Sequence, residues 1–388
     1  MTNMNRKNIL LIIIAATLLM ILIIYKTVWM SQLNNNSQPA QVEDIYALYT
    51  QHPELRFKVD SDYTYSSSLI DLTPDAILND KAAFISWQIS TIKFIKDLYN
   101  AIPLESPKGL IWENDQQHQY GILKQYHCAW PDRHPLAGSK TGGTIAIPVT
   151  PLKDSPLVIF IHGHGMVPSR EERTALFAAG SPAAELLAKG FTIWAPDNVY
   201  HEELKQLFSS YDYSMMWAKV ANLTWPLLQH VTSKSRGSIV IGIAAGGLTG
   251  LVMSITNNDI SGLITSGAFF PLELTRRDYR IKGHPICHDF RQFTSYVPIY
   301  ACVLGRPLQI QMGRKDALWI GKPLVPGNNN FTGTKRGVFA EETLGGISLL
   351  KDISKKIKSR FSFVLHEGGH TDIDIQSALG FISAIPGY

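Results

Sequence analysis

Residues 238–256 read SIVIGIAAGGLTGLVMSIT, and this stretch decides the fold. Its first six residues are apolar or small and rich in β-branched side chains, which predicts a buried strand. The following residues have the length and composition of a helix. Gly242, Gly246 and Gly247 lie around the junction, and small residues there are what a tight strand-to-helix turn requires.

Similar apolar runs alternate with helical stretches from about residue 121 to the end of the chain. Further strands are predicted for GGTIAIP, PLVIFIHG, FTIWAP, GLITSGAFF, PLQIQMG and FSFVLHE, and further helices for SPAAELLAKG and SMMWAKVANLTWPLLQHV. Strands that are apolar throughout and separated by helices indicate a mostly parallel sheet covered by helices on both faces. The predicted fold class is therefore α/β.

The composition excludes several classes of protein. Of the 388 residues 45% are hydrophobic, which is too large a share for a disordered chain. Thirty-six Lys and Arg against 32 Asp and Glu leave a net charge of +4 without basic runs, so no nucleic-acid partner is expected. Cys128, Cys287 and Cys302 form no C-x-x-C pair, so neither a disulfide scaffold nor a structural zinc site is expected.

An uninterrupted apolar run lies near the N-terminus. Residues 9–24 read ILLIIIAATLLMILII, and Arg6 and Lys7 precede them. A helix over residues 9–29 is long enough to contact and cross a lipid bilayer, whereas a cleaved signal peptide is the alternative interpretation. We expect an uncleaved anchor, because no small-x-small cleavage site follows the run. The basic residues then place the C-terminal domain outside the cytoplasmic membrane, in the periplasm or at the cell surface.

These patterns predict five segments. Residues 1–8 form a cytoplasmic tail, residues 9–29 the transmembrane anchor and residues 30–45 a polar linker. Residues 46–110 form a short helical extension, and residues 111–388 form the main α/β domain. The clearest element of the extension is AAFISWQISTIKFIKDLYNAI, in which these apolar residues recur at helical spacing: Phe84, Ile85, Ile89, Ile92, Phe94, Ile95 and Leu98. Nothing in the sequence indicates an oligomeric state.

Three loops after predicted strands carry residues suited to chemistry, and functional groups collect at the carboxyl ends of strands in open α/β sheets. The sequence His-Gly-His-Gly at residues 162–165 follows LVIFI, and its glycines allow backbone N–H groups to face a negatively charged oxygen. Asp316 follows PLQIQM, where a carboxylate can orient a histidine. His370 lies in a glycine-flanked turn after FSFVL and can act as a general base.

The fourth such loop is the strand-to-helix turn in residues 242–247. Its glycines have the spacing of the G-x-S-x-G nucleophile elbow, but Ala244 stands at the position of the nucleophile. A hydroxyl is therefore missing where the attacking group would be. Position 244, Asp316 and His370 follow one another in the order nucleophile, acid, histidine.

Together these residues resemble the α/β-hydrolase superfamily. Within it, the chain is most similar to the serine esterases related to dienelactone hydrolases and bacterial acetyl xylan esterases, over roughly residues 120–388. The resemblance rests on HGHG, IGIAAGG, HPICHDF, LGRPLQIQMGRKD and HEGGH. In those relatives a GISxGG elbow carries the serine, an RPL(L)I strand leads to G-x-x-D, and a G-G-H turn supplies the histidine. Arg306-Pro307-Leu308, Asp316 and His370 match those positions, and Ala244 departs from them.

The resemblance implies a role for each position. Position 244 would hold the nucleophile, His370 would take its proton, and Asp316 would fix the imidazole. Backbone N–H groups of Ala245 and of the His164 region would form the oxyanion hole. Further residues are candidates for lining the pocket: His162, Gly163, Gly165, His284, Cys287, His288 and Trp319.

A metal site is the other functional interpretation of the H-x-x-C-H segment at residues 284–288. The segment supplies only three nearby ligands, so neither a metal nor another cofactor is expected. Cys302 precedes the acid strand and is not at an elbow, so it is not expected to replace the missing nucleophile.

Ala244 leaves two explanations open. In one, an engineered exchange has replaced a natural serine, and the retained His370, Asp316 and glycines favour this explanation. In the other, the alanine is natural and the fold has become a binding or regulatory module. A full-length chain that includes its anchor favours the second explanation.

The expected function is that of a membrane-anchored, extracytoplasmic carboxylester hydrolase that uses an acyl-enzyme and is inactive with Ala244. The alternative is a pseudo-hydrolase that binds a small acylated or carbohydrate ligand without turnover. An acyltransferase with the same triad is not distinguished from a hydrolase by the sequence. In each case the expected partner is a small-molecule ester substrate or ligand.

Overall fold

The computed structural model describes residues 80–113, 115–163, 166–167, 172–198, 213–232, 237–269, 296–316 and 336–385. The predicted cytoplasmic tail, anchor and linker lie outside these ranges. Among the residues described, no helix combines the length and the hydropathy of a membrane span.

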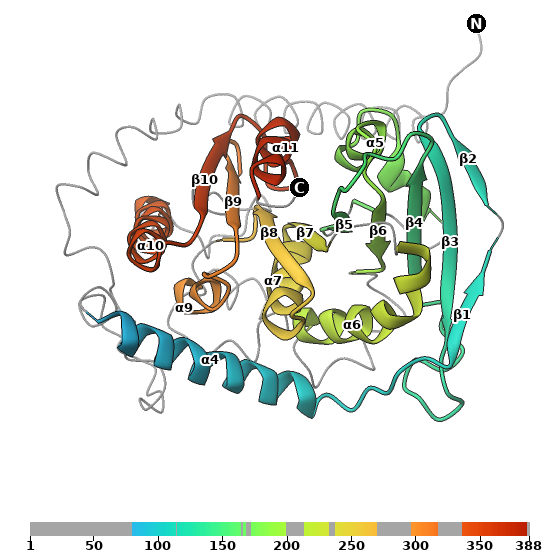
Figure 1. The fold of residues 1–388 in the computed structure, drawn as a ribbon, viewed down its shortest axis with the longest axis horizontal. Coiled ribbons are helices and arrows are strands. Elements are labelled where there is room, and N and C mark those ends of the chain that lie inside the picture. The colour runs from blue at the N-terminus through green and yellow to red at the C-terminus, as the bar shows by residue number, and fades with distance from the viewer. Residues whose placement is uncertain are drawn as a thin grey trace, which may run out of the picture. The chain divides into compact units, whose positions relative to one another are not determined.

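A ten-stranded sheet forms the centre of the described residues (Figure 1). Its order is β1-β3-β4-β6-β5-β7-β8-β9-β10, and β2 pairs with β3 beside this order. Neighbours from β6 to β10 run parallel, whereas β1 to β4 pair antiparallel. The strands are β1 (Gly109–Trp112), β2 (Gln116–His118), β3 (Gly121–Ala129), β4 (Gly142–Pro148), β5 (Leu157–Ile161), β6 (Ile193–Pro196), β7 (Ser238–Ile243), β8 (Ile260–Ser266), β9 (Leu308–Gly313) and β10 (Phe361–His366).

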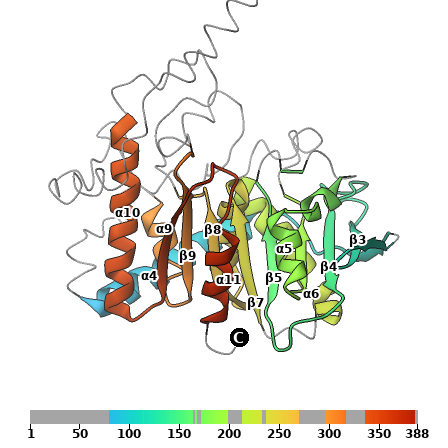
Figure 2. The same ribbon diagram turned by 90° about the horizontal axis from the view of Figure 1, so that it is seen from above.

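Helices cover both faces of this sheet (Figures 1 and 2). Helices α5 and α11 lie on one face, α6, α7 and α9 lie on the other, and α10 packs against α9 and β10. The α/β class and the mostly parallel sheet predicted from the sequence are confirmed. The helices are α4 (Lys81–Ala101), α5 (Pro182–Ala188), α6 (Tyr213–Thr232), α7 (Ala245–Thr256), α9 (Val297–Ala301), α10 (Arg336–Ile357) and α11 (Ile375–Ser383), with the 3₁₀-helix η2 (Arg173–Phe177) before α5.

The core is centred on β5 and β7, whose residues are all buried. Both β5 and β7 have a neighbouring strand on each side and helices on both faces of the sheet. The side chains on both faces are therefore apolar, which explains why apolar and polar residues do not alternate along these two strands. Helix α7 is buried from Ala245 to Ile255 and packs against β5, β7, β8 and α6. The segment that decides the fold is therefore also its most enclosed part.

Helix α4 confirms the predicted helix of the N-terminal extension and packs against α6 and α7. It begins after Asp80, whose carboxylate accepts the N–H groups of Ala82 and Ala83. The predicted apolar face is partly wrong. Phe84 and Ile95 are buried, but 41% of Ile85 and 63% of Ile89 is exposed. The fully buried residues of the helix form a narrower stripe of Phe84, Thr91 and Ile95.

Candidate active site

The turn between β7 and α7 has a strained backbone at its apex. Ala244 has φ 51° and ψ −119°, a conformation that side-chain-bearing residues rarely adopt. Its N–H donates to the carbonyl of Ser266 at 2.7 Å, and its carbonyl accepts the N–H of Gly247 at 2.9 Å. The backbone therefore forms a tight strand-to-helix elbow with Ala244 at its apex, as the spacing of its glycines predicted.

Glycines allow this turn to lie close to the sheet. A Cβ on Gly242 would lie 2.4 Å from the carbonyl oxygen of Gly246, and one on Gly246 would lie 2.2 Å from that of Ile161. A Cβ on Gly247 would lie 2.4 Å from the Cβ of Ala268. The expectation that small residues are required at these three positions is confirmed.

The loop after β5 lies directly beside the elbow. A Cβ on Gly163 would lie 2.9 Å from the Cβ of Ala244, and its N–H donates to Met166 Sδ at 3.2 Å. The neighbouring His162 is buried, and this burial lowers its pKa. His164 and Gly165, which the sequence placed in this loop, lie outside the described residues.

Asn198 fixes the position of this loop, although the sequence analysis did not select it. Its side-chain N–H donates to the carbonyl of His162 at 2.8 Å, and its amide oxygen accepts the hydroxyl of Thr249 in α7 at 3.1 Å. Asn198 lies two residues after Pro196, which ends β6, and a polar residue at that carboxyl end was the signal available in the sequence.

Asp316 and His370 are brought together from loops after β9 and β10. The Nδ1 atom of His370 lies 3.0 Å from Oδ2 of Asp316. Asp316 is 1% exposed, whereas the His370 side chain is 27% exposed. A carboxylate at Nδ1 retains the ring proton there, so Nε2 is the nitrogen available to accept a proton.

Strand register places these loops at one edge of the sheet. Ile243 pairs with Ser266, Ser266 pairs with Gln311, and Gly313 pairs with His366, so β9 and β10 end two residues beyond β7 and β8 at this edge. Gly267 has φ +61°, and a Cβ on it would lie 2.1 Å from the carbonyl oxygen of His370. The end of β8 thus contacts both the elbow and the histidine loop.

Arg306 lies elsewhere, although it belongs to the motif that carried the resemblance. Its guanidinium donates to the carbonyl oxygens of Ser254, Asn257 and Ile260. These groups lie near the carboxyl end of α7 and the start of β8. The position therefore stabilises the helix that begins at the elbow, from its far end.

The remaining candidates are four pocket residues and one cysteine. His284, Cys287, His288 and Trp319 lie outside the described residues, and within the described ranges no group of three or more His, Cys, Asp or Glu is placed to hold a metal ion. Cys302 is buried, and burial raises the pKa of its thiol, which disfavours the reactive thiolate.

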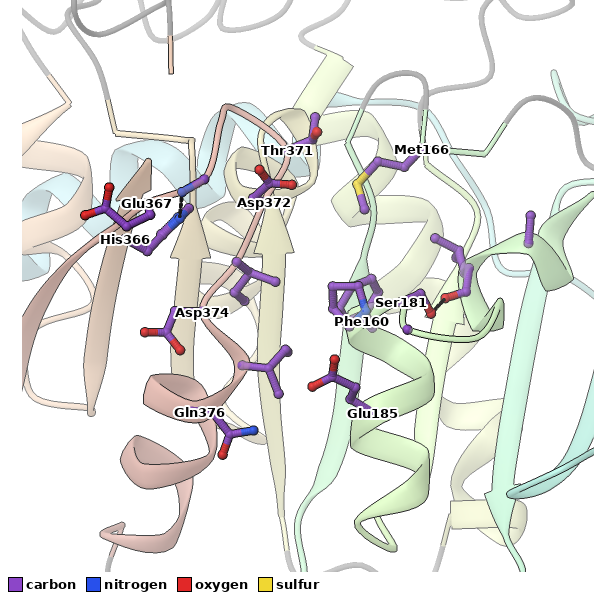
Figure 3. A pocket seen from close by; sticks show the side chains of 17 residues that line it. Phe160, Met166, Ser181, Glu185, His366, Glu367, Thr371, Asp372, Asp374 and Gln376 are labelled. Atoms are coloured by element: carbon purple, nitrogen blue, oxygen red, sulfur yellow. Dashed lines mark hydrogen bonds between the residues drawn. The ribbon is translucent and has the colours of Figure 1, made fainter. Parts of the chain in front are cut away.

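A cleft of about 570 Å³ lies beside the histidine loop, between α5 and α11 (Figure 3). Its lining includes the apolar side chains of Phe160 and Leu176, and it also includes Gly368 and Thr371, which lie on either side of His370 in the chain. The charged side chains of the lining are carboxylates, so the cleft disfavours anionic ligands. These carboxylates are Glu185, Glu367, Asp372 and Asp374.

No family model matches the chain, and no curated protein matches it in sequence. Solved structures match most of its length. A glucuronoyl esterase from Solibacter usitatus has a TM-score of 0.56 at 13% identity, covering 84% of this chain and 98% of that one. A glucuronoyl esterase of carbohydrate esterase family 15 from Teredinibacter turnerae has a TM-score of 0.51 at 12% identity, covering 88% and 99%. A protein assigned as an acetyl xylan esterase from Bacteroides fragilis has a TM-score of 0.50 at 15% identity, covering 81% of each chain.

Sheet order, elbow and these likenesses define the chain as a protein of the α/β-hydrolase fold. At identities of 12–15% the likeness concerns the fold. The resemblance found in the sequence is confirmed at this level, and these structural neighbours are named glucuronoyl esterases and an acetyl xylan esterase.

Proposed function

We propose that this protein is an α/β hydrolase of the carboxylester type, whose catalytic machinery surrounds a missing hydroxyl. The observation that supports the proposal is the retained geometry around Ala244: a strained elbow backbone and a His370–Asp316 contact of 3.0 Å. The favoured ligand is a carboxylic ester of a sugar, because the neighbours in structure are named glucuronoyl and acetyl xylan esterases.

With a serine at position 244, these groups perform acyl transfer in two steps. His370 Nε2 takes the hydroxyl proton as the oxygen attacks the ester carbonyl, and Asp316 stabilises the imidazolium that forms. N–H groups of Ala245 and of the loop after β5 stabilise the negatively charged oxygen. The C–O bond then breaks, the alcohol leaves with the proton from His370, and water releases the acid from the acyl-enzyme by the same route.

With Ala244 the first step has no nucleophile. Loss of the nucleophile of such a triad lowers turnover by about 10⁶-fold, while the oxyanion hole and ligand binding are retained. The chain as it stands therefore binds an ester without forming an acyl-enzyme. We expect no labelling of this chain at position 244 by a fluorophosphonate probe.

The decisive experiment is the variant Ala244→Ser. We expect it to be labelled by a fluorophosphonate at residue 244 and to hydrolyse p-nitrophenyl acetate, acetylated xylose or a methyl glucuronate ester. Two controls isolate the cause. Ala245→Ser places a hydroxyl one residue away, and His370→Asn in the serine background removes the base, so neither is labelled. A folded Ala244→Ser protein with neither labelling nor hydrolysis would contradict the proposal.

Ala244 itself favours a second candidate, a non-catalytic protein that binds an acylated or carbohydrate ligand in the same site. This candidate predicts a thermal shift with the ligand in both the Ala and the Ser forms and turnover in neither. The labelling and hydrolysis assays of the serine variant therefore separate the two candidates directly.

The proposed location rests on the apolar run of residues 9–24 and on Arg6 and Lys7 before it. We infer that residues 9–29 anchor the protein, with the α/β domain outside the cytoplasmic membrane. The full chain should resist extraction from membranes by alkaline carbonate, and a chain lacking residues 1–41 should be recovered without the membrane. Extraction of the full chain by carbonate would contradict the anchor.

A further inference from the structure

Ser266 lies between the elbow and the histidine loop and contacts both. It is the last residue of β8, is fully buried, and pairs with Ile243 of β7 on one side and Gln311 of β9 on the other. Its carbonyl and its hydroxyl form hydrogen bonds with two different segments, the elbow and the histidine loop. Its carbonyl accepts the N–H of Ala244 at 2.7 Å, and its hydroxyl donates to the carbonyl of Asp372 at 2.5 Å.

The carbonyl of Asp372 belongs to the segment that carries His370. This segment is closed on itself, because the Asp372 carboxylate accepts the N–H of Gly369 at 2.6 Å. The hydroxyl of Ser266 therefore holds the base of a small loop with His370 at its centre. Gly267, the next residue, lies against the carbonyl of His370.

His366 adds a further contact to this arrangement. Its Nδ1 accepts the N–H of Gly368 at 3.1 Å, so its ring proton is on Nε2, which lies 3.4 Å from the Ser266 hydroxyl. Burial lowers the pKa of His366, while the nearby charges of Asp372, Asp374, Asp316 and Glu367 act in the opposite direction. Figure 3 shows His366 and Asp372 on the connection between β10 and α11 that forms one wall of the cleft.

We propose that Ser266 is a positioning residue that sets the histidine loop relative to the elbow, through its hydroxyl on one side and its carbonyl on the other. Its effect on catalysis rests on the function proposed above, whereas its effect on the His370–Asp316 contact does not. Removing the hydroxyl leaves the Asp372 carbonyl without this donor and lets the loop shift. A displacement of about 1 Å at a reacting group can lower a rate by about 100-fold.

The first test uses the Ala244 protein and needs no catalysis. Proton NMR of the Nδ1–H group of His370 reports its hydrogen bond to Asp316. We expect Ser266→Ala to shift or broaden this resonance. The matched control is Ser254→Ala, because Ser254 is also a buried serine whose hydroxyl donates to a backbone carbonyl, that of Gly250 within α7. The control should leave the resonance unchanged.

The second test uses the Ala244→Ser background. There Ser266→Ala should lower kcat about 10- to 100-fold with KM nearly unchanged, whereas Ser254→Ala should have little effect. Ser266→Cys nearly retains the side-chain volume but has a weaker hydrogen-bond donor. It should change the His370 resonance and kcat in the same direction as Ser266→Ala, and it replaces that variant in both tests if the alanine protein does not fold.

The proposal is overturned if folded Ser266→Ala or Ser266→Cys leaves the His370 resonance where it is in the parent protein. It is also overturned if the control shifts the resonance equally. If Ala244→Ser proves inactive, the function proposed above fails, while the NMR result still decides the role of Ser266.

Discussion

Ala244 is held in a backbone conformation that is costly for any residue with a side chain. A positive φ of 51° with ψ −119° costs of the order of 1–3 kcal/mol and persists only where the surroundings impose it. Here a strand, a helix and the carbonyl of Ser266 impose it. The surroundings thus impose the strained conformation of the elbow, which is why, on the function proposed above, we expect the single exchange Ala244→Ser to confer activity.

Gly246 provides a test of this packing by a single methyl group. A Cβ there would lie 2.2 Å and 2.6 Å from the backbone carbonyl oxygens of Ile161 and His162, so α7 or β5 must move. We expect Gly246→Ala to lower the free energy of unfolding by about 2–3 kcal/mol, as overpacking of a core does. Urea denaturation measures this change.

Gly380 is the matched control for that substitution. It lies within α11, and a Cβ there meets nothing within 4 Å. Gly380→Ala should therefore stabilise the protein by about 0.5–1 kcal/mol, because alanine loses less backbone entropy in a helix. Equal stability of Gly246→Ala and the parent protein would contradict the close contact of elbow and sheet.

At the scale of elements, α4 is attached to the domain in its first half and at its last turn. The side chain of Gln88 donates to the carbonyl oxygens of Ala301, Cys302 and Leu304, at the end of α9. Lys219 of α6 lies at the other end, below the last turn of α4. The helix therefore braces the α6/α7/α9 face of the sheet rather than forming a separate unit.

Lys219 makes this attachment testable. Its ammonium donates to the carbonyl oxygens of Tyr99, Asn100 and Ile102 at the last turn of α4, where the negative end of the helix dipole lies. We expect Lys219→Met to lower the free energy of unfolding by about 2–3 kcal/mol and to speed hydrogen exchange of α4 amides.

Lys93→Met is the control for this prediction. Lys93 also lies on α4 and pairs with Asp97 at 2.6 Å, but the two side chains are 75% and 60% exposed. Such surface pairs contribute about 0–1 kcal/mol, so this variant should resemble the parent protein. If both variants unfold alike, the buried ammonium is not what attaches α4.

At the scale of the whole molecule, stability should depend on pH through buried histidines. Burial lowers the pKa of His162 in the folded state below the unfolded value of about 6.5. The unfolded chain therefore binds the proton first as the pH falls, and the free energy of unfolding decreases below about pH 6.5. Protonation of His162 changes the free energy of unfolding by up to about 1.4 kcal/mol per pH unit. Burial also lowers the pKa of His366, so its protonation destabilises the folded state over the same pH range.

Urea denaturation between pH 8 and pH 5 tests this dependence. Asp374 does not contribute to the change in stability over this range. Its hydrogen bonds to Ser377 lower its pKa, and the stability contributed by a carboxylate with a lowered pKa is lost only near and below pH 4. His162→Gln should reduce the slope. A free energy of unfolding that does not change from pH 7 to pH 5 would contradict a buried neutral His162.

The sequence patterns predicted the strands of the parallel half of the sheet, the four helices α4, α5, α6 and α7, and the elbow between β7 and α7. Each of these is a local pattern: an apolar run of strand length, a helical period, or glycines where a backbone turns sharply. It did not predict β1, β2 and β3, which are more polar, and it placed Ile85 and Ile89 on a buried face. Periodicity indicates that a helix is amphipathic, but the partner decides how wide the buried stripe is.

The sequence alone indicated the α/β class and a strand-to-helix elbow with Ala244 at its apex, because these depend on residues that are neighbours in the chain. The contact of His370 with Asp316 was an expectation from a resemblance until the tertiary structure brought the two side chains together. The contacts of Ser266 and Asn198 were visible only in the tertiary structure. They depend on the register of β6, β7, β8 and β10, strands that are distant in sequence, and no local pattern encodes which of their ends meet.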